Sequence, residues 1–139
     1  MVEDRAYEEI RIGDRASVTR TITEEDVAAF AELSGDVNPL HVDAEYAAST
    51  PFGQRVAHGM LAASLISTVV GTRLPGLGAV YLGQELRFVA PTRLGDTLTA
   101  TGEVIHKRED KPILRLRTTV ARDDGTIVVE GEAVVKKQS

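Results

Sequence analysis

Hydrophobic and polar residues follow two different periods in the two halves of the chain. In much of the first half, apolar residues recur at three- and four-residue intervals, as in helices, whereas in the second half they alternate, as in strands. Helices grouped before strands favour an α+β domain with an antiparallel sheet over a parallel β-α-β array. The pattern therefore predicts one antiparallel sheet wrapped around one very apolar helix.

The first half is expected to hold a strand and three helices. Residues 15–22 alternate and predict a strand. Thr23 is expected to cap a helix that Gly35 ends, and Asp43 to cap a shorter helix as far as about residue 49. Residues 59–70 are small or apolar nearly all round, which is typical of a helix buried on every side.

The second half is expected to form four strands, because apolar and polar residues alternate in each of its segments. Asp123-Asp124-Gly125 is a strong turn signal between the last two of them. The four expected strands lie within residues 80–88, 98–104, 114–120 and 127–135.

The segment 34–43 carries the first candidate chemistry. It places a carboxylate, an amide and an imidazole, those of Asp36, Asn38 and His41, in a segment that Gly35 and Pro39 predict to be a rigid loop. A carboxylate that converges with a histidine can hold water and transfer protons. The same residues are also an ordinary way to leave a helix, and composition alone favours that simpler interpretation.

The second candidate is the start of the apolar helix, at His58-Gly59. Free amides at a helix N-terminus stabilise negative charge, and glycine lets a ligand approach the backbone closely. Alternatively, Gly59 only permits tight packing and His58 helps to close the helix end. His106 is expected at the surface, and three dispersed histidines without cysteine give little support to a metal site.

Composition excludes several other classes of function. Sixteen basic and 21 acidic residues give a net charge of −5, and aromatic residues make up only 4% of the chain, so no nucleic-acid partner is expected. The absence of cysteine excludes disulfides and a thiol nucleophile. The longest apolar stretch, about residues 60–70, is too short to cross a bilayer, and no signal peptide is visible. We expect a cytoplasmic protein with no membrane partner.

Several motifs together resemble the MaoC-like (R)-specific enoyl-CoA hydratases. They are the segment 36–43 (Asp-Val-Asn-Pro-Leu-His-Val-Asp), then His58-Gly59-Met60, and later the segments 81–88, 91–96 and 131–136. The match runs in order from about residue 12 to residue 137. The short form is similar to bacterial hydratases that feed polyhydroxyalkanoate synthesis.

The resemblance implies a single hot-dog domain over residues 1–139, with an antiparallel sheet around a long central helix, in a homodimer. It implies reversible syn hydration of a trans-2-enoyl-CoA thioester to the (R)-3-hydroxyacyl-CoA, with no cofactor or metal, because coenzyme A is part of the substrate. Asp36 and His41 match the catalytic dyad, Asn38 the residue that supports it, and Gly59 the amide that binds the thioester oxygen.

By the same resemblance, Ser67, Val70 and Phe88 are candidates to line the acyl slot. Two alternatives share the fold: a (3R)-hydroxyacyl-acyl-carrier-protein dehydratase, and a non-catalytic partner subunit, which should have lost the dyad. A hot-dog thioesterase is disfavoured, because residues 59–72 contain no carboxylate.

Overall fold

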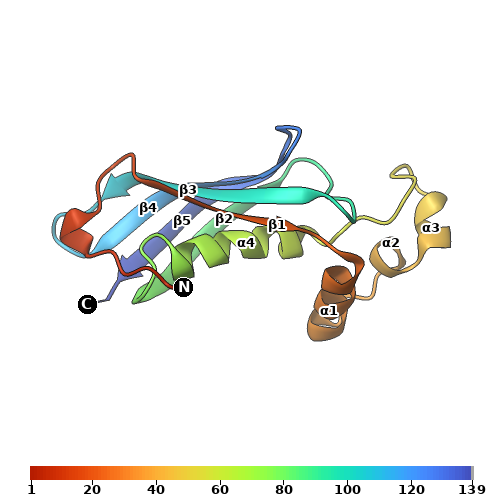
Figure 1. Ribbon diagram of the computed structural model, residues 1–139, viewed down its shortest axis with the longest axis horizontal. Helices are drawn as coiled ribbons and strands as arrows, with labels where there is room; N and C mark the ends of the chain where they lie inside the picture. The colour runs from red at the N-terminus through yellow and green to blue at the C-terminus, as the bar shows by residue number, and fades with distance from the viewer. Residues whose placement is uncertain (139) are drawn as a thin grey trace.

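Five antiparallel strands form a single sheet in this computed structural model, which describes residues 1–138 (Figure 1). Across the sheet the strands follow the order β1-β3-β4-β5-β2, so that β1 and β2 form its two edges. All five strands expected from the sequence are confirmed. They are β1 (Arg15–Thr21), β2 (Ala79–Phe88), β3 (Thr97–Lys107), β4 (Ile113–Arg122) and β5 (Ile127–Lys137).

Local capping signals determine where the first helices begin and end. Thr23 caps α1 (Glu24–Ser34) through a capping box with Asp26, and Gly35 ends it in the left-handed conformation at φ 78°. Asp43 caps α3 (Ala44–Ala48), accepting from two of its first amides. These bounds confirm the helices predicted around Thr23 and Asp43; a short 3-10 helix, η1 (Tyr7–Glu9), precedes β1.

The apolar helix α4 (Gly59–Thr72) lies along one face of the curved sheet (Figure 1). Its residues Ala62, Ile66 and Val69 are almost fully buried against sheet residues such as Leu98 and Val120. Burial on this scale is the main favourable contribution to folding. The arrangement confirms the expected α+β hot-dog fold, with an antiparallel sheet around a long central helix.

The segment after α1 differs from the expected loop. Residues Pro39–Val42 form a short helix, α2, whose first position is Pro39 itself. Proline is well tolerated there because a helix leaves its first amide unpaired in any case. The Asn38 side chain caps this turn by accepting from the amide of Leu40 at 3.0 Å. His41 therefore projects from a helical turn rather than from a loop.

The edge strand β2 exposes apolar side chains. Val80, Tyr81 and Leu82 are 36%, 37% and 51% exposed, on a strand that pairs only with β5. An unpaired apolar edge is typical of a site where another strand adds to a sheet. Within residues 1–138, no helix is both long and apolar enough to cross a membrane.

Candidate active site

The helices α1 and α2 bring Asp36 and His41 together near one end of α4. The Nε2 atom of His41 lies 4.0 Å from Oδ2 of Asp36, too far for a direct hydrogen bond. The His41 side chain is 14% exposed, whereas that of Asp36 is 53% exposed. A mostly buried imidazole thus faces a carboxylate that is open to solvent.

The tautomer of His41 follows from its other ring nitrogen. Nδ1 lies 2.7 Å from the carbonyl oxygen of Val56, which can only accept, so Nδ1 carries the proton. When the ring is neutral, its Nε2 atom is then a free acceptor on the side that faces Asp36. This is the arrangement that a proton-accepting histidine requires.

Arg55 holds the backbone of His41 in place. Its Nε donates to the carbonyl oxygen of His41 at 2.7 Å, and its Nη1 pairs with Oε1 of Glu24 at 2.9 Å. The guanidinium therefore connects α1 to α2. A second contact supports the backbone of α2, because the amide of Val56 donates to the Leu40 carbonyl at 3.3 Å.

The N-terminus of α4 begins next to this pair. The amide of Gly59 finds no acceptor among residues 1–138, as expected for the first turn of a helix. A Cβ atom at Gly59 would lie 2.7 Å from Cδ1 of Phe88 and 2.8 Å from its Cε1. Only glycine fits beneath this ring without displacing it.

An apolar cavity of about 360 Å³ adjoins these groups. His41, Gly59 and Phe88 all line it, so it brings the dyad histidine and the α4 terminus to one space. The rest of its wall is mostly apolar and comes from α4, β5, and the segments before α4 and after β2: Phe52, Val56, Ala57, Ala62, Val89, Ala90, Pro91, Thr92, Val128 and Val129.

The other two proposed lining residues lie away from this cavity in the described chain. Ser67 is exposed on α4, and Val70 is 2% exposed in a separate part of the core with Ile10, Leu74 and Leu114. Their role in acyl-chain length stays a prediction. His106 is exposed on β3, which confirms the surface position expected for it.

His58 is the residue of this site whose role the sequence did not reveal. Its side chain is 2% exposed and stacks on His41, with ring centroids 3.9 Å apart and planes inclined by 27°. Its Nε2 lies 2.9 Å from the backbone oxygen of Asp36. The one available signal was a histidine directly before the glycine that begins the apolar helix.

Asp36, His41 and His58 also present possible metal-ligand atoms within 4.8 Å of one another. The histidines are thus less dispersed in space than along the chain. However, Nδ1 of His41 and Nε2 of His58 both face backbone carbonyl oxygens, and the two rings are stacked face to face. Stacked rings do not direct their remaining lone pairs at one central ion, so this donor set does not fit a metal centre.

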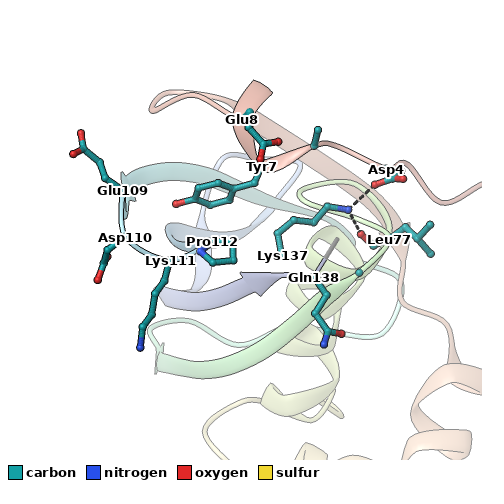
Figure 2. A pocket seen from close by; sticks show the side chains of 12 residues that line it. Asp4, Tyr7, Glu8, Leu77, Glu109, Asp110, Lys111, Pro112, Lys137 and Gln138 are labelled. Carbon is teal, nitrogen blue, oxygen red and sulfur yellow. Dashed lines mark hydrogen bonds and ion pairs between the residues drawn. The ribbon is translucent and has the colours of Figure 1, made fainter.

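A larger cavity, of about 760 Å³, lies at the opposite end of the molecule, near the C-terminal end of α4 (Figure 2). Figure 2 shows the Lys137 side chain running along it, with Nζ 2.5 Å from Oδ1 of Asp4 and a second bond to the Leu77 oxygen. The Tyr7 ring forms another part of its wall. Lys137 is engaged with Asp4 and Leu77 in this wall, and no residue of the dyad lines it.

Comparison with known proteins identifies close relatives. The family described as MaoC like domain matches residues 10–125. The (R)-specific enoyl-CoA hydratase of Rhodospirillum rubrum is 50% identical over 93% of this chain and 89% of its own. That of Aeromonas caviae is 48% identical over 91% of this chain and 95% of its own. The R-hydratase PhaJ1 of Pseudomonas aeruginosa, in its unliganded form, superposes with a TM-score of 0.95 at 46% identity, covering 99% of this chain and 88% of that one.

Proposed function

This chain belongs to the MaoC-like family, and we propose that it is an (R)-specific enoyl-CoA hydratase that adds water reversibly to a trans-2-enoyl-CoA. The observation that carries the proposal is that His41 and Gly59 line one apolar cavity, while Asp36 lies 4.0 Å from Nε2 of His41. Syn hydration requires a proton-transfer pair and an oxyanion donor on a substrate held between them.

The dyad supplies the proton transfer. Asp36 and His41 hold one water between them; as its oxygen bonds to Cβ, an O–H bond breaks and the pair takes the proton. The electron pair of the C=C bond moves towards the thioester oxygen. The same pair then returns a proton to Cα on the same face, which makes the addition syn; attack of the water on one face of Cβ sets the (R) configuration of the 3-hydroxyacyl product. The free Nε2 of His41 supports this role, because it is the unprotonated nitrogen of that ring.

The Gly59 amide donates a hydrogen bond to the thioester oxygen and stabilises the negative charge that develops there. This N–H has no acceptor among the described residues and lies at the positive end of the α4 dipole. Removal of one such donor typically lowers kcat by about 10²–10³-fold. In this proposal the reaction needs no cofactor, since coenzyme A enters and leaves as part of the substrate.

The active form is proposed to be a homodimer, joined through the exposed edge of β2. Val80, Tyr81 and Leu82 would be covered, and the unpaired backbone groups of this edge would find partners. Sedimentation should give twice the chain mass, and Leu82→Lys should shift the protein towards the monomer. A wild-type monomer would contradict the proposed assembly. The cytoplasmic location stays a prediction.

The test of the activity is a hydration assay that follows loss of the enoyl-thioester absorbance with crotonyl-CoA and then with octenoyl-CoA. An (R)-specific coupling enzyme reads the chirality of the product. Turnover to the (R) product is expected, and an (S) product would refute the proposal. Failure on both CoA esters, with turnover of the corresponding carrier-protein thioester, would instead assign the chain as a dehydratase of acyl-carrier-protein substrates.

Variants of the dyad test its assignment. Asp36→Asn and His41→Ala should each lower kcat by about 10²–10⁴-fold with the fold intact. His106→Ala is the matched control, because His106 is exposed on β3. Wild-type kcat in either dyad variant would remove that residue from the mechanism.

A further inference from the structure

One buried side chain, that of His58, connects the two halves of the active site. It directly precedes Gly59 in the chain, and it contacts both Asp36 and His41. We propose that His58 is a positioning residue for the hydration reaction, which fixes the dyad relative to the Gly59 amide. This inference rests on the proposed function and adds a residue to which no catalytic role was assigned above.

The contact with Asp36 is a directed hydrogen bond. A backbone carbonyl only accepts, so Nε2 of His58 carries the proton and donates to the Asp36 oxygen at 2.9 Å. Asp36 itself is exposed and directly follows the Gly35 end of α1. The hydrogen bond therefore fixes the backbone of a catalytic residue that lies at the surface.

The contact with His41 is made by the ring face. The two imidazoles lie 3.9 Å apart between centroids, and the Phe30 ring contacts His58 with centroids 4.8 Å apart at 54°. His58 thus lies between Phe30 of α1 and His41 of α2. Its ring packs against one face of the His41 imidazole and so restricts the rotation of that imidazole.

The link to the oxyanion site is covalent. The N–H proposed to bind the thioester oxygen belongs to the peptide bond between His58 and Gly59. When the His58 side chain is held by Asp36 and His41, the orientation of this peptide relative to the dyad is restricted as well. A displacement of about 1 Å between reacting groups can lower a rate by roughly 10²-fold, so such a link affects turnover.

Two simpler roles for His58 agree less well with its contacts. The side chain makes no capping hydrogen bond to α4, so it does not close the helix end. Nor is filling space a sufficient role, because Nδ1 is buried with no hydrogen-bond partner among residues 1–138. A phenylalanine would fill the same space without leaving a polar atom unsatisfied. What an imidazole adds over phenylalanine is the Nε2–H donor to Asp36.

The experiment compares His58→Phe with His58→Gln in the full-length protein. Phenylalanine keeps the stacked ring and removes the donor, whereas glutamine presents an amide N–H at a similar reach and removes the ring. We measure kcat and KM for crotonyl-CoA hydration, with thermal melting as the check on folding. His106→Gln is the matched control at an exposed histidine.

We expect His58→Phe to lower kcat about 10- to 100-fold with KM within about twofold, and His58→Gln to recover most of the lost kcat. Wild-type kcat in His58→Phe would overturn the proposal. So would a loss in His58→Gln as large as that in His58→Phe, because the restored donor would then have no effect, and so would the failure of both variants to fold, which would assign His58 to packing. Failure of the proposed function is distinguishable, because the wild-type protein would then not hydrate crotonyl-CoA either.

Discussion

Gly59→Ala is the sharpest single perturbation of the proposed oxyanion site. The added Cβ would lie 2.7 Å from Cδ1 and 2.8 Å from Cε1 of Phe88. Carbon atoms in favourable contact lie about 3.5–4.0 Å apart, so the ring would have to retreat by roughly 0.8 Å or more. Phe88 is 51% exposed, which leaves its ring free to swing towards solvent without moving the backbone.

The effects of this substitution on stability should nearly cancel. An off-rotamer ring costs about 0.5–1.5 kcal/mol, while alanine favours a helix over glycine by up to about 1 kcal/mol. The free energy of unfolding should therefore change by no more than about 1 kcal/mol in either direction. Alanine keeps the backbone N–H, but its methyl group lies beside that amide and hinders the approach of the thioester oxygen, so kcat should fall by up to about 10²-fold.

A double-mutant cycle separates the two effects. Denaturant unfolding and crotonyl-CoA hydration are measured for the wild type, Gly59→Ala, Phe88→Ala and the double variant. If the Phe88 ring is the obstacle, Gly59→Ala should be more favourable to stability by about 0.5–1.5 kcal/mol when Phe88 is already alanine. Wild-type kcat in Gly59→Ala would refute the close approach of the thioester oxygen to this amide. Simple additivity of the two stability changes would refute the steric argument.

Three further predictions concern the acyl slot, a surface ion pair and a buried lysine. Ser67→Phe should lower kcat/KM for octenoyl-CoA relative to crotonyl-CoA; an unchanged ratio would remove this position from the acyl slot. The Arg20 guanidinium holds the pKa of the Asp26 carboxyl below its usual value. The ionised carboxylate therefore stabilises the folded protein at neutral pH, and this contribution is lost as pH falls through that lowered pKa. In urea unfolding, Asp26→Asn should cost about 1 kcal/mol at pH 7 and progressively less below about pH 4; a pH-independent difference would contradict this origin. Lys137 is buried and its Nζ bonds Asp4, so Lys137→Met should destabilise the protein by about 1–3 kcal/mol in the same assay. Lys136→Met, at an exposed neighbour, should not; equal effects would show that the buried ion pair is not the cause.

Local signals in the sequence predicted most of the fold. The Thr23 and Gly35 signals gave the bounds of α1, and the alternating segments gave the strands, because caps and periodicity depend on neighbours within a few residues. Such local signals could not predict the order of the strands across the sheet. It places β2 at an edge, next to β5, although the two are separated by β3 and β4 along the chain.

The short helix α2 shows how one residue type can mislead. Pro39 predicts a loop after α1, yet proline also suits the first position of a helix. The difference matters for the site, because the helical turn directs His41 towards Asp36. The Asn38 cap was visible as a residue in the sequence, but which following amide it would bind depended on that turn.

The contacts that relate the dyad to α4 all come from tertiary packing, which explains why the motif at residues 36–43 could not reveal them. The segment just before α4 is held on two sides: the Val56 oxygen lies 2.7 Å from Nδ1 of His41, and the amide of Ala57 donates to the Thr92 oxygen at 2.7 Å. His58 then contacts the dyad itself. Substitutions in residues 56–58 should therefore change the geometry between the proton-transfer pair and the oxyanion donor. The motif identifies the reacting groups, and the segment before α4 determines whether they can act on one substrate.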